Sequence, residues 1–184
     1  NPNNSIITFE YDLFDRVIKQ TDSKWTYSEF TYDTSGNILT QKVSDINNIL
    51  LQKQTNTFDK LNRNIITNIH NIDTNEVITS KSKYDTVWNI IQSVDPKWNV
   101  VNYEYDEFNR VIKITDSLSN ITKSIYNKND KVTSTTITSA EGKVITTSYI
   151  YDNDNRVTSQ TNTLWETVSY TYNNLNQVVS KTDK

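Results

Sequence analysis

The chain of 184 residues contains no cysteine, no methionine, only two glycines and two prolines, one alanine and one histidine. Without cysteine it can form no disulfide, no thiolate nucleophile and no cysteine metal site. Alanine, the strongest helix former, is almost absent, whereas Thr, Ile, Val and Tyr are abundant. These branched and planar side chains pack well on pleated strands. The composition therefore predicts an all-β chain.

Long apolar runs and concentrated charge are also missing. No stretch approaches the roughly 20 apolar residues that a membrane helix requires. The net charge is only -3, and the basic residues are spread along the chain. A nucleic-acid-binding surface needs clustered Lys and Arg, so we expect neither nucleic-acid binding nor membrane insertion.

One dipeptide, an aromatic residue followed by Asp or Asn, recurs along the whole chain. Its eight copies are separated by 21, 26, 26, 21, 21, 25 and 21 residues. A repeated period of this length is typical of repeat architectures. We therefore expect residues 1–184 to form one array of eight units. The units start at Tyr11, Tyr32, Phe58, Tyr84, Tyr105, Tyr126, Tyr151 and Tyr172.

Each unit is predicted to contain two strands and two tight turns. The fifth position of seven units holds a residue type that tolerates a positive φ, which indicates a turn. A β-type run follows, then a second polar cluster, then a strand with alternating aromatics. The predicted fold is a continuous, twisted and curved sheet of antiparallel hairpins without helices. The seven fifth-position residues are Asp15, Gly36, Asn62, Asn109, Asp130, Asn155 and Asn176.

All four arginines lie four residues after the Asp of a repeat, whereas the fifteen lysines lie mostly elsewhere. Only the planar guanidinium fork holds a carboxylate through two bonds, so this sorting indicates a specific contact. We hypothesise an Asp to Arg clasp across the first turn, with the Asp also accepting backbone N–H bonds. The predicted pairs are Asp12 with Arg16, Asp59 with Arg63, Asp106 with Arg110, and Asp152 with Arg156.

The stretches YDLFDRVIKQTD (11–22), YDEFNRVIKITD (105–116) and YDNDNRVTSQT (151–161) resemble the Rhs or YD-repeat family. The resemblance covers nearly the whole chain, although the turn glycines of the family are mostly Asn, Asp or Trp here. It implies a shell that encloses or displays a toxin or effector domain in a secreted or cell-surface protein. The partners it implies are other repeats of the parent chain and the enclosed domain. It also implies a fragment of a longer chain, as does the missing Met at position 1.

The candidate chemical sites favour structural roles. His70 has no second His or clustered carboxylate at a metal-ligand spacing, and we expect it to be exposed to solvent. The carboxylate pairs Asp12 with Asp15 and Asp152 with Asp154 belong to recurring turns, so turn chemistry is favoured over acid–base catalysis or calcium binding. No Ser or Thr lies beside an evident base. We predict no catalytic residues, no enzyme activity, no metal and no cofactor.

Tryptophan leaves two interpretations open. Trp25, Trp98 and Trp165 each lie 14 residues after the Tyr of their unit, where the resembling family has its second turn glycine. Trp88 occupies the first turn's glycine position. An indole at a hairpin tip can stack on a sugar ring, or it can fold over the adjacent hairpin and cover the sheet edge. Burial is favoured because Trp is mostly buried on average. The expected function is structural, with a carbohydrate-binding or adhesion module for cell-surface glycans as the alternative.

Overall fold

The structure is a computed structural model that describes residues 6–22 and 26–184. These residues form sixteen β-strands and no helix, so the all-β expectation is confirmed. Each odd-numbered strand ends at the aromatic residue that opens a repeat, as the period predicts. The strands are β1 (Thr8–Tyr11), β2 (Val17–Thr21), β3 (Tyr27–Tyr32), β4 (Ile38–Ser44), β5 (Leu50–Phe58), β6 (Asn64–His70), β7 (Val77–Tyr84), β8 (Ile90–Val94), β9 (Val100–Tyr105), β10 (Val111–Thr115), β11 (Ile121–Tyr126), β12 (Val132–Thr138), β13 (Val144–Tyr151), β14 (Val157–Asn162), β15 (Thr167–Tyr172) and β16 (Val178–Asp183).

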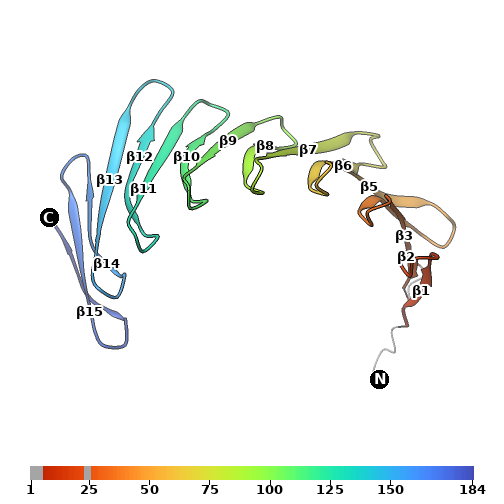
Figure 1. Cartoon of the computed structure of the whole chain (residues 1–184), viewed down its shortest axis with the longest axis horizontal. Helices are drawn as coiled ribbons and strands as arrows, with labels where there is room; N and C mark the ends of the chain where they lie inside the picture. The colour runs from red at the N-terminus through yellow and green to blue at the C-terminus, as the bar shows by residue number, and fades with distance from the viewer. Residues whose placement is uncertain (1–5, 23–25) are drawn as a thin grey trace. The chain divides into compact units, whose positions relative to one another are not determined.

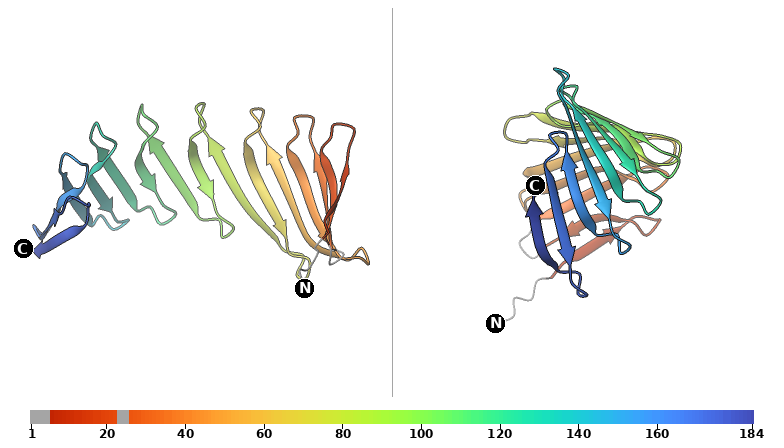
Figure 2. Two further views of the ribbon diagram at one scale, coloured as in Figure 1. Left: turned by 90° about the horizontal axis from the view of Figure 1, so that it is seen from below. Right: turned by 90° about the vertical axis from the view of Figure 1, so that its left-hand side faces the viewer.

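The strands follow one another in the sheet in their sequence order, from β1 to β16. This linear order gives an open antiparallel sheet, as expected for a chain of hairpins. Contacts divide the chain into two units, Asn1–Lys83 with Ser93–Trp98, and Tyr84–Gln92 with Asn99–Lys184. Within each unit, short turns join neighbouring strands into successive hairpins (Figures 1 and 2).

A β-bulge precedes the aromatic residue of the repeat. In the β3 and β4 pair, Thr31 lies opposite Thr40, but Tyr32 lies opposite Ile38, so one residue is extra. The same register shift occurs before Tyr11, Phe58, Tyr126, Tyr151 and Tyr172. A bulge increases local twist and re-aims a side chain. It therefore sets the direction of the repeat's aromatic ring, which the sequence pattern alone does not reveal.

Most of the described turns at both ends of the hairpins have the same three-residue form, whereas the turn between β6 and β7 is one residue longer, with the Asn71 N–H donating to the Glu76 carbonyl. At the first turn, the Asp12 N–H donates to the Arg16 carbonyl at 2.9 Å, and the Asp15 N–H donates to the Asp12 carbonyl at 3.2 Å. This is a type I turn followed by one residue in the left-handed region. All seven predicted fifth positions have a positive φ, as expected. Trp88, at the eighth, also has one, at 75°.

The sheet has no apolar core within the described residues. No hydrophobic side chain there is buried, and Ser44, at 5% exposure, is the one buried residue. A single-layer sheet has no second layer to cover either face. Its stability must therefore come from contacts between neighbouring hairpins, as in other repeat architectures.

Candidate functional site in the repeat turns

The structure brings all four predicted Asp and Arg pairs together. Asp12 Oδ2 accepts hydrogen bonds from both Nε and Nη2 of Arg16, each at 2.7 Å. Asp12 Oδ1 accepts the backbone N–H groups of Phe14 and Arg16 at 2.8 and 3.0 Å. One carboxylate therefore closes the turn through its main chain and its side chain together. The Nε to Oδ2 distances in the other three pairs are 2.7 to 2.8 Å.

The clasp changes the acidity of its carboxyl groups. The side-chain hydrogen bond from Arg16 is the largest influence on Asp12, and it lowers the pKa of that carboxyl below its ordinary value. The bond from Arg63 does the same for the pKa of Asp59. Burial opposes the effect in both. The clasp therefore favours the ionised form of these carboxyl groups.

The same clasp also forms without arginine. Asn37, Asn89 and Asn120 each donate from Nδ2 to the carboxylate four residues earlier, at 2.8 to 2.9 Å. The Thr26 hydroxyl donates to Asp22 at 2.8 Å in the second turn of the first repeat. Sequence reasoning missed these residues because it followed guanidinium groups. The signal was present in the sequence, since each of these donors lies four residues after an Asp.

The clasping arginines also reach the next repeat. Arg16 Nη1 donates to the Asp33 carbonyl at 3.0 Å, and its guanidinium carbon lies 4.6 Å from the centre of the Tyr32 ring. The Tyr32 hydroxyl donates back to the Val17 carbonyl at 2.6 Å. These three contacts fasten adjacent hairpins together. We call this set of contacts the Arg–Tyr staple.

The staple recurs in the second unit. Arg110 contacts the Asn127 carbonyl at 3.0 Å and lies 4.7 Å from the Tyr126 ring centre. Arg156 repeats the arrangement with Tyr172 at 4.8 Å. These tyrosine rings face guanidinium groups of the preceding repeat. The bulge before each aromatic residue accounts for this arrangement, because it turns the ring toward the preceding turn.

Trp98 and Trp165, at two of the second turns, are exposed. Trp98 is 62% exposed and Trp165 is 85% exposed, and their φ angles of 65° and 64° lie in the left-handed region. The favoured interpretation, burial over the neighbouring hairpin, is wrong for Trp165. Lys81 Nζ lies 5.1 Å from the ring centre of Trp98. Trp25 lies outside the described residues, and ligand binding by the three indoles stays a prediction.

His70 is half-buried, so the expectation that it is exposed to solvent was wrong. It ends β6 but lies between two strands, opposite Lys53 on one side and Val77 on the other. Its Nε2 atom is buried and has no hydrogen-bond partner within the described part of the chain. In the same part of the chain, no three His, Asp or Glu side chains come close enough to hold a metal ion.

The carboxylate pairs have turn roles in the structure. The carboxylate of Asp12 is held by Arg16, and Asp15 is an exposed turn residue with a φ of 59°. Asp152 is clasped by Arg156, and the Asp154 carboxylate lies 3.2 Å from Arg156 Nη2. Over residues 6–22 and 26–184 we also find no helix with the length and apolar character that crossing a membrane requires.

One solved structure shares this arrangement of hairpins. It is a Tc holotoxin pore of Photorhabdus luminescens, with a TM-score of 0.53, 12% sequence identity, and coverage of 97% of this chain. The chain has an Rhs/YD-repeat fold. It spans only 12% of the length of that Photorhabdus chain.

Two further solved structures are similar with lower scores. Crystal structures of TcdB2-TccC3, complete and without its hypervariable C-terminal region, have TM-scores of 0.46 and 0.45 at 13% identity. Each covers 95% of this chain, which matches 13% of theirs. No family model and no curated protein matches the sequence.

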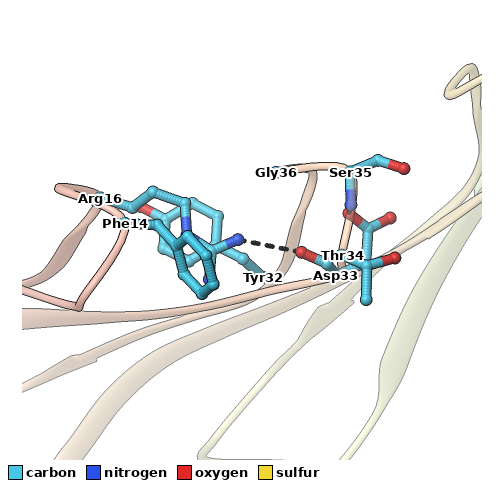
Figure 3. A pocket seen from close by; sticks show the side chains of 7 residues that line it. All are labelled: Phe14, Arg16, Tyr32, Asp33, Thr34, Ser35 and Gly36. Carbon is cyan, nitrogen blue, oxygen red and sulfur yellow. Dashed lines mark hydrogen bonds between the residues drawn. The ribbon is translucent and has the colours of Figure 1, made fainter.

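Grooves lie between adjacent YD turns. One, of about 430 Å³, lies between Phe14, Arg16 and Tyr32 on one side and residues 33–36 of the next turn on the other (Figure 3). An equivalent groove of about 400 Å³ in the second unit is lined by Phe108, Arg110 and Tyr126. In each groove, the arginine and the tyrosine of one Arg–Tyr staple form part of the lining.

Proposed function

We propose that this chain is a non-catalytic wall segment of a larger secreted or cell-surface YD-repeat protein. In that protein the sheet forms part of a shell that encloses or displays a toxin or effector domain. The observation that carries the proposal is the Arg–Tyr staple, because the strongest polar groups of the turns are used to fasten one hairpin to the next.

The Asp–Arg clasp that positions the staple uses groups that a catalytic site would need free. The Asp12 and Asp106 carboxylates are each saturated by an arginine and by two backbone N–H groups. An ionised carboxylate held in this way is a poor general base, because its lone pairs are engaged and its pKa is lowered. The repetition of the same geometry in several turns favours a mechanical role over a reaction at one place.

The uncovered apolar side chains favour a wall that faces a partner. Ile69 lies opposite Ile78 in the first unit, and Ile137 lies opposite Ile145 in the second, each partly exposed. Contiguous exposed apolar side chains on a soluble protein mark surfaces that are covered in the working assembly. An enclosed domain, or the chain segments next to it, supplies such a cover.

The similar Photorhabdus structure is a toxin assembly, which agrees with this proposal at the level of the fold. Since this chain matches only 12% of that chain, a comparable shell requires many more repeats. The expected localisation outside the producing cell, and the enclosed effector, belong to the same proposal.

The test uses the complete native protein that contains this segment. It is digested under native conditions with a protease, and the surviving peptides are identified by mass spectrometry. The proposal expects a long run of further repeats and a separate polypeptide that resists digestion until the repeats are unfolded with denaturant. A protein that ends within a few repeats, with no protected polypeptide, would rule out the shell.

A second candidate function, carbohydrate binding or adhesion, is favoured by Trp98 and Trp165. A large residue in the left-handed region is strained, and an exposed indole gains little from burial. Strain without local compensation points to a role in binding. The variants Trp98→Gly and Trp165→Gly each remove the indole and also relieve the backbone strain at the positive φ. Unchanged binding of both variants to a glycan array, compared with the unaltered chain, would reject this candidate.

A further inference from the structure

The groove between the first two YD turns differs in one atom group from the surroundings of Arg110 and Arg156. In those two repeats, the arginine at the sixth position donates to the side-chain oxygen at the fifth position of the next repeat. Arg110 Nη1 donates to Asp130 Oδ1 at 2.7 Å, and Arg156 Nη1 donates to Asn176 Oδ1 at 2.7 Å. A fifth-position oxygen therefore fills the space above the guanidinium.

Gly36 occupies that fifth position in the second repeat, so the oxygen is missing. No heavy atom lies within 4 Å of the place where its Cβ would be. Arg16 Nη1 carries two N–H bonds, and one of them donates to the Asp33 carbonyl. Within the described residues, the other meets no acceptor of the kind that Asp130 gives Arg110. The groove is therefore open between Arg16 and Gly36 (Figure 3). The corresponding place beside Arg110 is occupied by the Asp130 carboxylate.

We propose that this groove binds an uncharged sugar residue, whose hydroxyl or amide oxygen takes the place of the missing side-chain oxygen at Arg16 Nη1. This inference goes beyond the wall function and does not rest on it. The site is also separate from the tryptophans of the second candidate function, because none of them lines the groove.

The charges around the groove favour an uncharged ligand. Arg110 already has the carboxylates of Asp106 and Asp130, and Arg156 has those of Asp152 and Asp154. Arg16 has the carboxylate of Asp12, and the carboxylate of Asp33 lines the same groove. The hydrogen bond from the Asn37 side chain lowers the pKa of Asp33, which keeps that group ionised. The negative charge of these two carboxylates would repel an anionic ligand, whereas it would not repel a neutral oxygen acceptor.

The walls match the two kinds of surface that a sugar ring presents. Phe14 is 79% exposed, with its ring centre 5.3 Å from the Arg16 guanidinium carbon. Such a ring can pack against the C–H face of a pyranose. Thr34 and Ser35 on the facing turn are exposed and line the groove, so their hydroxyls can bond ring hydroxyls. The volume of about 430 Å³ is typical of a small-molecule site.

The test follows the Arg16 Nε–H and Gly36 amide signals by NMR while glucose, galactose, mannose and N-acetylglucosamine are added separately to the 184-residue chain. A saturable shift of both signals with at least one sugar is expected. Gly36→Asn supplies the oxygen that Asn176 supplies elsewhere, and it should weaken the binding at least about tenfold. Phe14→Ala should also weaken it. Asp130→Gly opens the equivalent groove, and a new saturable shift should appear at the Arg110 Nε–H signal.

Two sets of controls distinguish sugar binding in this groove from binding at the tryptophans and from binding of polar groups in general. Trp98→Gly and Trp165→Gly should leave the Arg16 shift unchanged, because the groove does not include those residues. Acetate and acetyl-asparagine methylamide serve as probes for a carboxylate and for a polypeptide amide. Binding of either probe with no response to any sugar would overturn the proposal. So would a Gly36→Asn variant that keeps its folded spectrum and binds sugar as tightly as the unaltered chain.

Discussion

The guanidinium carbon of Arg16 lies 4.6 Å from the centre of the Tyr32 ring, which belongs to the following repeat. The Tyr32 hydroxyl donates to the carbonyl of Val17, the residue that follows this arginine. Each residue therefore contacts the hairpin of the other. In an array without an apolar core, such reciprocal contacts are what couple one hairpin to the next.

Arg110→Lys should lower the thermal midpoint of the chain by about 2–4 °C. Lysine can keep one contact with the Asp106 carboxylate, but it cannot hold two atoms of the fork on that oxygen, stack flat on the Tyr126 ring and reach the Asn127 carbonyl together. The measurement is circular dichroism at a β-sheet wavelength during heating.

Lys143→Gln is the matched control for this variant, because Lys143 is exposed in a second turn and only its backbone groups are bonded to that turn. We expect the control to leave the midpoint unchanged. An Arg110→Lys midpoint that equals the control would show that the staple adds nothing to stability.

Stability should fall when the clasped aspartates are protonated. The folded pKa values of Asp12, Asp33, Asp59 and Asp116 are lowered mainly by side-chain hydrogen bonds. A lowered folded pKa stabilises the fold above the unfolded pKa, and this contribution is lost as the pH falls through the folded pKa. The urea midpoint should therefore be level from about pH 7 to 5 and decline below about pH 4.

Asp59→Asn tests whether the clasp causes the decline. Asn127 and Asn173 keep the turn's backbone hydrogen bonds at this position, so the turn should still form. We expect a lower urea midpoint at pH 7 and a shallower decline in acid, because one titrating group has been removed. An unaltered acid decline would assign the effect to other groups.

Trp165→Gly should raise the free energy of unfolding by about 0.5–1 kcal/mol. Trp165 has a φ of 64° and is 85% exposed, so glycine relieves backbone strain and little burial is lost. Thr163→Gly in the same loop is the control. Thr163 is not among the residues with positive φ, so its replacement should be destabilising by a similar amount. Urea unfolding followed by far-ultraviolet circular dichroism measures both.

The local features of the fold could be predicted from the sequence, because they depend on neighbouring residues. The positive φ of Asn62 and Asn155 follows from the residue type at a fixed place in the repeat. The Asp to Arg spacing of four likewise spans one turn. The direction of the repeat's aromatic ring could not be predicted, because the bulge controls it. Whether the ring at Tyr32 faces Tyr11 or Arg16 depends on a one-residue register shift, and both arrangements fit the same alternating pattern.

Exposure was the least predictable property of the candidate sites. Trp165 and His70 were assigned from average behaviour, the first to a buried and the second to an exposed position, and both assignments were wrong. In a single-layer sheet the turn residue Trp165 has no second layer to cover it, whereas His70 lies in β6 between two neighbouring strands. The place of each residue in its hairpin therefore explains these two outcomes better than the average behaviour of its residue type.

Tyr126→Phe should destabilise its own neighbourhood by about 1 kcal/mol and leave distant hairpins unchanged. The variant removes the hydroxyl that donates to the Val111 carbonyl at 2.8 Å but keeps the ring that faces Arg110. Hydrogen exchange followed by mass spectrometry should show faster exchange in β10 and β11, and the same exchange in β15 and β16. Tyr11→Phe is the control, because Tyr11 is 55% exposed in the first strand. Equal acceleration in all hairpins would mean that the array unfolds as one cooperative body, and that nearest-neighbour staples do not set its local stability.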